Sequence, residues 1–156
     1  RNLRVEQHHA DYWVDWAEAS DVSRDALIAG TDDPATSALA HWCWRTCERE
    51  ALAISVAATH YAIEGATGEW SNLVCSTPTY ANLFAESERK KATRWLRQHA
   101  QYDDTHPWEA LDIMCTLLGN EPDPAQILPM RTAICTSYRY MAMTLDRCMA
   151  MEQPAS

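Results

Sequence analysis

Glycine is scarce in this chain, with only 4 residues in 156. Ala, Leu, Glu, Arg and Met, which favour helices, are abundant, and no segment alternates apolar and polar residues between turn signals as a strand would. Hydrophobic residues make up 47% of the chain and charged residues 22%, which is typical of a folded globule. We therefore expect an all-α protein, with residues 1–156 forming a single helical-bundle domain.

Apolar residues at helical spacing predict helices joined by short turns. The expected helices cover 2–19, a short segment from about 23 that stops at Gly30, 35–70 as two helices broken near 47–49, 81–105, 109–118, and a last helix that ends near 151. We expect loops at 71–80 and 121–124. Pro107 disfavours the helical conformation at His106, so a boundary or kink should fall there. The last helix is apolar on more than one side, which predicts a homodimer.

The charge balance and apolar runs exclude several protein classes. The formal net charge is −9, and nucleic-acid binders carry basic patches, so we expect no nucleic-acid partner. The uncharged stretch 51–63 is too short and too polar to span a bilayer. No secretory signal opens the chain, which favours the cytoplasm. The first residue is Arg rather than Met, which suggests that an N-terminal piece has been removed or left out.

The six cysteines do not form a recognisable framework. They contain no C-x-x-C pair, and most lie inside apolar runs; their positions are 43, 47, 75, 115, 135 and 148. In a cytoplasmic domain this pattern predicts reduced, buried thiols rather than disulfides or a zinc site.

The strongest chemical signal is the segment His99-Ala-Gln-Tyr-Asp103-Asp-Thr-His106. His99, Asp103 and His106 are spaced at i, i+4 and i+7, which places them on one face of one predicted helix. Ala92 and Trp95 share that face, so we expect it to point toward the core. Two imidazoles and a carboxylate are costly to bury unless something satisfies them, and a divalent metal does so. A hydrogen-bonded polar cluster or a solvent-facing stripe is the alternative.

Two further segments offer ligands of the same kind. Glu6 and His9 form a Glu-x-x-His pair, the arrangement that aims two bundle side chains at one metal, while His8 is expected to be exposed. Glu64 follows the apolar run that starts at Ala51, and His60 lies four residues before it, as a partner or supporting donor. Each of these features alone is also compatible with an ordinary surface residue. Together, the three segments supply the six ligands that two iron or manganese ions in a helical bundle require.

These segments resemble a known family. Tyr61-Ala-Ile-Glu64-Gly-Ala-Thr-Gly-Glu69-Trp70, followed by His99-x3-Asp103-x2-His106-Pro, is similar to the heme-oxygenase-like di-iron oxidases, relatives of thiaminase II and of pyrroloquinoline quinone synthase. The resemblance covers residues 3–118. The Glu-x-x-His form of the first pair is like the fatty-acid decarboxylase branch. Family members usually have an additional helix before the first ligand helix, so the resemblance implies a bundle without its N-terminal helix and a partly open site.

The resemblance implies a non-heme di-iron oxygenase or oxidase that uses O₂ to oxidise a small organic substrate. Its metal ligands would be Glu6, His9, Glu64, His99, Asp103 and His106, holding two iron ions with manganese as the alternative metal. The expected catalytic residues are Glu64 together with Tyr61, one turn before it, and Tyr102, beside Asp103, the two tyrosines as supporting residues. Two other hypotheses remain open. One is a metal-free enzyme on the same fold, with Cys75 or Cys135 imagined as a nucleophile; the other is a non-catalytic helical metal-binding or interaction protein.

Overall fold

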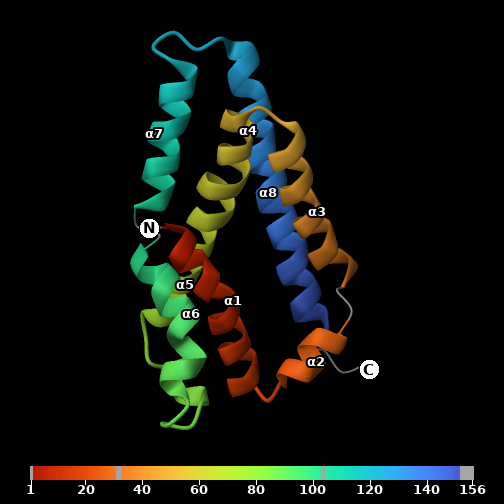
Figure 1. Ribbon diagram of the computed structural model, residues 1–156, viewed down its shortest axis with the longest axis vertical. Helices are drawn as coiled ribbons and strands as arrows, with labels where there is room; N and C mark the ends of the chain where they lie inside the picture. The colour runs from red at the N-terminus through yellow and green to blue at the C-terminus, as the bar shows by residue number, and fades with distance from the viewer. Residues whose placement is uncertain (1, 31–32, 103–104, 152–156) are drawn as a thin grey trace. The chain divides into compact units, whose positions relative to one another are not determined.

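The structure is a computed structural model that describes residues 2–30, 33–102 and 105–151; the side chains of 2–7, 102 and 151 also lie outside the description. The elements in chain order are α1 (Asn2–Ala19), α2 (Arg24–Ala29), α3 (Pro34–Arg49), α4 (Leu52–Val56), the π-helix η1 (Ala57–Glu64), α5 (Gly65–Cys75), the 3₁₀ turn η2 (Ala81–Leu83), α6 (Arg89–Tyr102), α7 (His106–Leu118) and α8 (Pro124–Met151). Every regular element in the described ranges is helical, which confirms the all-α prediction (Figure 1). No helix among the described residues is long and apolar enough to cross a bilayer.

The chain divides into two compact units. Unit 1 comprises residues 1–31 and 67–103, and unit 2 comprises residues 32–66 and 104–156. In unit 1, α1 packs along α6 (Figure 1), while α2 contacts α1 and η2 contacts α6. In unit 2, α8 packs against both α3 and η1, and α7 packs against η1 and α4.

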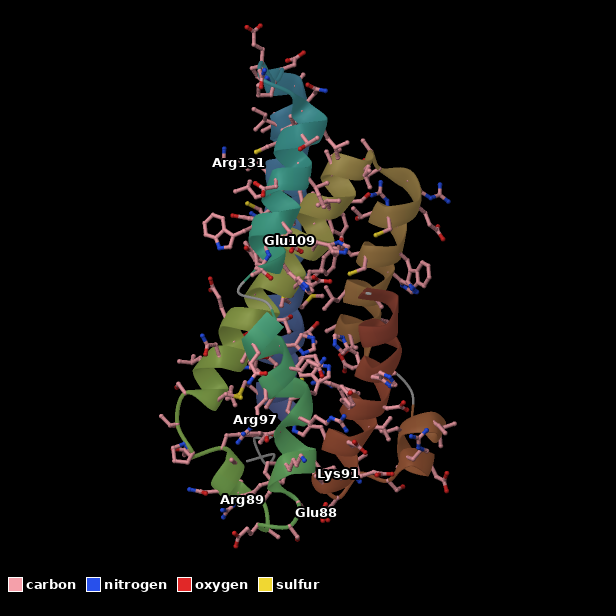
Figure 2. All side chains as sticks on the ribbon, turned by 60° about the vertical axis from the view of Figure 1, so that its left-hand side comes forward. Glu88, Arg89, Lys91, Arg97, Glu109 and Arg131 are labelled. Carbon is pink, nitrogen blue, oxygen red and sulfur yellow. The ribbon has the colours of Figure 1, made fainter. Side chains whose placement is uncertain are left out.

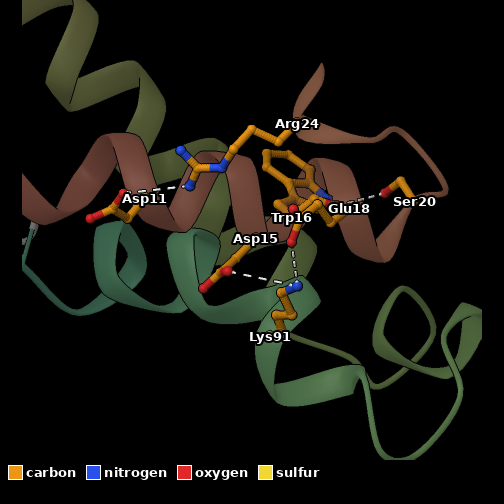
Figure 3. Close-up of polar contacts among 7 residues, drawn as sticks. All are labelled: Asp11, Asp15, Trp16, Glu18, Ser20, Arg24 and Lys91. Carbon is orange, nitrogen blue, oxygen red and sulfur yellow. Dashed lines mark hydrogen bonds and ion pairs between the residues drawn. The ribbon is translucent and has the colours of Figure 1, made fainter. Parts of the chain in front are cut away.

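Ion pairs join α1 to α6 in unit 1. Lys91 Nζ lies 2.6 Å from Glu18 Oε2 and 3.8 Å from Asp15 Oδ1, as Figure 3 shows. The hydrogen bond from Lys91 lowers the pKa of the Glu18 carboxyl, and the same bond raises the pKa of Lys91. These groups are solvent-exposed, so their contribution to stability is small. Burial of the apolar residues Ala92 and Leu96 of α6 also stabilises unit 1.

The core of unit 2 is built on small side chains around η1. Ala57 and Val56 are buried against Ala110 and Met114 of α7 and Met130 of α8, with Tyr61 packed at the edge. Because Ala57 has only a methyl group, the backbone of η1 can approach both neighbouring helices closely. The π-helical segment is therefore held by helices on two sides.

Several sequence-based boundaries are correct because capping residues define them. Asp33 caps α3 through Ala35 N at 2.9 Å, with Pro34 in the first turn. The break predicted near 47–49 falls at residues 50–51, between α3 and α4. Gly119, at φ +71°, ends α7 as expected.

Other boundaries were predicted wrongly. The expected loop at 71–80 starts late, because α5 runs on to Cys75. The expected helix 81–105 is a 3₁₀ turn followed, after an interval, by α6. The cysteines are not buried either: Cys43 and Cys75 are half-buried, and the other four are exposed.

We expect the folded chain to lose stability at acidic pH, because the carboxylate of Asp33 becomes protonated there. The hydrogen bond from Arg147 and that from Ala35 N lower the pKa of Asp33 below its ordinary value of 3.8. A folded-state pKa that is lowered contributes stability above the unfolded pKa, and this contribution disappears as pH falls through the folded pKa. Urea midpoints measured from neutral pH downward should therefore drop more steeply for the parent than for Asp33→Asn; parallel curves would contradict this role.

Candidate metal centre

Glu64 is positioned by a π-helical segment, which the sequence did not predict. Eight residues, Ala57–Glu64, form η1, and Glu64 is its last residue. The wider π turn changes the helical register, so the side chains after it leave the helix at altered angles. Such segments are frequent at functional sites because they re-aim particular side chains.

The Glu64 carboxylate lies between two imidazoles of unit 2. Its Oε2 is 3.4 Å from Nδ1 of His106, and its Oε1 is 3.9 Å from Nε2 of His60. The side chains of Glu64 and His106 are 36% and 27% exposed, whereas His60 is 61% exposed. His106 is therefore the closer and better-enclosed partner, and His60 is the more distant and more exposed one.

Gly65 permits the close approach that joins these residues. A Cβ placed on Gly65 would lie 3.1 Å from Cγ of Pro107, which directly follows His106. Glu64 and His106 are thus brought together where η1 meets the start of α7. A side chain at position 65 would require Pro107 to give way by a few tenths of an ångström.

Gly65→Ala should therefore weaken metal binding more than it weakens the fold. The added methyl requires a shift of a few tenths of an ångström at Pro107, which would move His106 away from Glu64. Fe(II) titration followed by metal analysis should show a lower affinity than the parent has. Gly30→Ala is the matched control, because its Cβ would meet Ala26 O at a similar 3.2 Å in unit 1. Equal iron affinity in parent and Gly65→Ala would contradict the prediction.

Unit 1 brings together the two histidines that the sequence placed on different helices. His9 of α1 and His99 of α6 have ring centroids 4.7 Å apart. His99 Nδ1 lies 2.9 Å from the carbonyl oxygen of Trp95. A carbonyl oxygen only accepts, so Nδ1 must carry the proton and Nε2 is the basic nitrogen, the usual arrangement in a metal-binding histidine. His8 is exposed, as predicted, and stacks on Tyr12.

One part of the site prediction was wrong. His99 and His106 do not share a helix, because α6 ends at Tyr102 and α7 begins at His106. The i, i+4, i+7 relation requires an unbroken helix, and Pro107 sits in the first turn of a new one. His106 instead meets Glu64 from the start of α7, as described above.

The structure describes only part of the predicted ligand set. Asp103 lies outside the described residues, as do the side chains of Glu6 and Tyr102, although Glu6 is within α1 and Tyr102 is the last residue of α6. Tyr61 is half-buried against the core of unit 2. Among the residues that are described, no three His, Cys, Asp or Glu side chains are grouped so as to hold a metal ion. Of the predicted ligands, the described part thus brings together His9 with His99 in unit 1 and Glu64 with His106 in unit 2.

The two half-buried cysteines, Cys43 and Cys75, can be compared with the alternative hypothesis of a metal-free enzyme that uses a cysteine nucleophile. Burial raises the pKa of the Cys75 thiol, and burial together with the neighbouring Cys47 raises that of Cys43. A raised pKa disfavours the thiolate, which is the nucleophilic form.

Comparison with solved structures identifies the fold. The chain superposes on a TenA homologue from Pseudomonas syringae pv. tomato str. DC3000 with a TM-score of 0.91 and 55% sequence identity, over 96% of this chain. The chain has the heme-oxygenase-like fold. The predicted resemblance to this fold family, which includes thiaminase II, is thereby confirmed.

This heme-oxygenase-like chain spans 62% of the length of that Pseudomonas relative and is therefore shorter. No protein-family model matches the sequence, and no curated protein matches it.

Proposed function

We propose that the chain binds two iron ions, with manganese as the alternative metal, and uses O₂ to oxidise a small organic substrate. The observation that carries the proposal is that each described candidate ligand lies beside another from a different helix. His9 of α1 meets His99 of α6, and Glu64 of η1 meets His106 of α7. Four ligands from distant parts of the sequence would not be expected to pair in this way by chance.

The donor chemistry suits iron. Imidazole nitrogen and carboxylate oxygen are the ligands of non-heme iron sites in helical bundles. Glu6, His9, His99 and Asp103 all belong to unit 1, where they would hold one ion. Glu64 and His106 of unit 2 would contribute to holding the second, with His60 supporting the carboxylate.

The residues of the chain have distinct tasks in this proposal. Iron, when bound, supplies the O₂ and one-electron chemistry. The Trp95 carbonyl fixes the ring of His99 with its Nε2 as the ligating atom, and His60, 3.9 Å from Glu64, would add a positive charge beside the carboxylate when it is protonated. Tyr61, three residues before Glu64 and packed at the edge of the unit 2 core, would limit water access.

A second candidate is a metal-free enzyme of the TenA and thiaminase II type. The match to the Pseudomonas TenA homologue favours it. In this chain the raised pKa of the Cys75 thiol weakens the case for that residue as its nucleophile.

An oxygen electrode distinguishes the two candidates. Iron-loaded protein supplied with a chemical reductant should consume O₂, and metal-stripped protein should not. Cys75→Ala should leave this consumption unchanged. If iron-loaded and metal-stripped protein behave alike, the iron proposal fails and the metal-free candidate is favoured.

We also propose that the chain associates with itself. Large apolar residues are exposed along α8, among them Leu128, Leu145 and Met149. Burying them against a second copy would remove this area from water. Light scattering at micromolar concentration should give more than the monomer mass of 17.7 kDa, and the monomer mass itself would refute the proposal.

A further inference from the structure

Aromatic rings form a continuous row through unit 1, starting at His99. The ring centroids of Trp95 and His99 are 3.9 Å apart. Trp16 stacks on Trp95, with ring centroids 5.6 Å apart and an interplanar angle of 22°. Trp16 Nε1 then donates a hydrogen bond of 2.7 Å to the hydroxyl oxygen of Tyr80. Four side chains from α6, α1 and the segment before η2 are thus in contact from end to end.

Two more tryptophans lie beside the row and do not extend it. The ring centroid of Trp13 lies 5.0 Å from that of Trp95 and 4.9 Å from that of Trp16. The ring centroid of Trp70 lies 6.3 Å from that of Trp95 and 6.2 Å from that of Trp16. Such a cluster exceeds what packing of an apolar core requires, since a bundle core is usually filled with aliphatic side chains. Trp16 contacts both Trp95 and Tyr80, so it is the link on which continuity depends.

Rings in this arrangement are suited to carry single electrons. Indole and phenol give up one electron more readily than aliphatic or amide groups do. The rate of electron tunnelling decreases exponentially with the distance between donor and acceptor. In this row each ring is in contact with the next, so each distance is short. The row therefore offers a sequence of short steps in place of one long step.

The far end of the row opens to solvent. Tyr80 lines a pocket of about 250 Å³, together with Cys75, Thr93 and Arg97. Arg97, labelled on α6 in Figure 2, is exposed and places a positive charge beside this pocket. A phenol that loses an electron also loses its proton, and pocket water can take that proton, which the nearby cation favours.

We propose that Trp95, Trp16 and Tyr80 form a relay for single electrons, which carries an oxidising equivalent from His99 to the pocket and discharges it there. Trp95 gives one electron to an oxidant beside His99, Trp16 re-reduces Trp95, and Tyr80 re-reduces Trp16 while its phenolic proton passes to water. A low-molecular-weight thiol then returns a hydrogen atom to Tyr80, and two thiyl radicals combine as one disulfide. The relay protects the protein when O₂ reacts without substrate.

The relay rests on the proposed function only for the source of the oxidant, so it can be tested without metal. Pulse radiolysis with the azide radical oxidises tryptophan selectively in the metal-free full chain. The indolyl absorption should convert to phenoxyl absorption in a first-order step whose rate does not depend on protein concentration. Tyr80→Phe should lose this conversion, because the ring remains but the oxidisable hydroxyl does not.

Trp16→Phe should also lose the conversion, because it removes the link to Tyr80. Trp108→Phe is the control, since that indole is 68% exposed on α7 and lies outside the row. It should convert as the parent does. The relay would be overturned if the indolyl-to-phenoxyl conversion persisted in Tyr80→Phe, or if the parent showed no such conversion. Both results decide the question even if Trp16→Phe fails to fold.

A second measurement separates this proposal from the iron proposal. Iron-loaded protein mixed with O₂ in the absence of organic substrate, and frozen quickly, should show a tyrosyl radical by electron paramagnetic resonance. The signal should be absent in Tyr80→Phe. Iron binding without this signal would refute the relay, whereas normal radiolysis in a chain that binds no iron would retain the relay and refute the metal centre.

Discussion

His9→Ala and His106→Ala should each remove about one bound iron per chain. The two histidines belong to different units and to different ligand pairs, with His99 and Glu64 respectively. Removing one imidazole leaves a ligand set with one nitrogen donor fewer, which binds iron more weakly. Metal analysis after anaerobic Fe(II) loading checks the result, and the double variant should bind almost none.

The same variants should lose iron-dependent stabilisation. Iron present at about a hundred times its dissociation constant stabilises the folded state by about 2.7 kcal/mol for each site. Thermal melts with and without Fe(II) should show the largest shift for the parent and smaller shifts for the two variants. His8→Ala and His41→Ala are the matched controls, since both imidazoles are exposed. Variants that match these controls would show that His9 and His106 are not ligands.

Leu96→Ala should destabilise the chain by about 3 kcal/mol, with or without metal, because truncating a buried leucine loses its transfer energy and leaves a cavity. Leu96 is 1% exposed on α6, next to buried Ala92 and Thr93. Leu73→Ala is the control in the same unit, because Leu73 is 74% exposed. Urea denaturation measures both. A loss for Leu96→Ala no larger than that for Leu73→Ala would contradict the packing described for unit 1.

Local chemistry explains why much of the fold could be predicted. Asp33 and Pro34 start α3, and Gly119 ends α7, because each acts through its own backbone and its nearest neighbours. The helical character of the chain followed from composition for the same reason. The interval before α6 was missed, because the residues from Phe84 onward are compatible with a helix and only tertiary contacts decide their conformation.

The candidate site was predictable by residue type but not by geometry. The sequence identified His9, His99, Glu64 and His106, and the structure pairs them. The π-helical segment that aims Glu64 is fixed by packing of η1 between α7 and α8, and no local pattern encodes it. The spacing of His99 and His106 suggested one helix, whereas Pro107 indicated a boundary, and the boundary prevailed.

The aromatic row shows the same limit. Trp13 and Trp16 are spaced to share a face of α1, which sequence can show. That Trp70 and Trp95 come to lie beside them depends on how α5 and α6 fold back in unit 1. The continuity of these rings with Tyr80 likewise depends on tertiary structure, and sequence spacing cannot show it.

The metal content of the purified protein tests the central claim most directly. Protein made in iron-supplemented medium, and titrated anaerobically with Fe(II), should carry about two iron ions per chain if both pairs belong to metal sites. Manganese in place of iron would keep the metal centre but change the metal. A chain that carries well under one iron or manganese ion, and that fails to bind Fe(II) anaerobically, would contradict the metal centre and favour a metal-free enzyme on the heme-oxygenase-like fold.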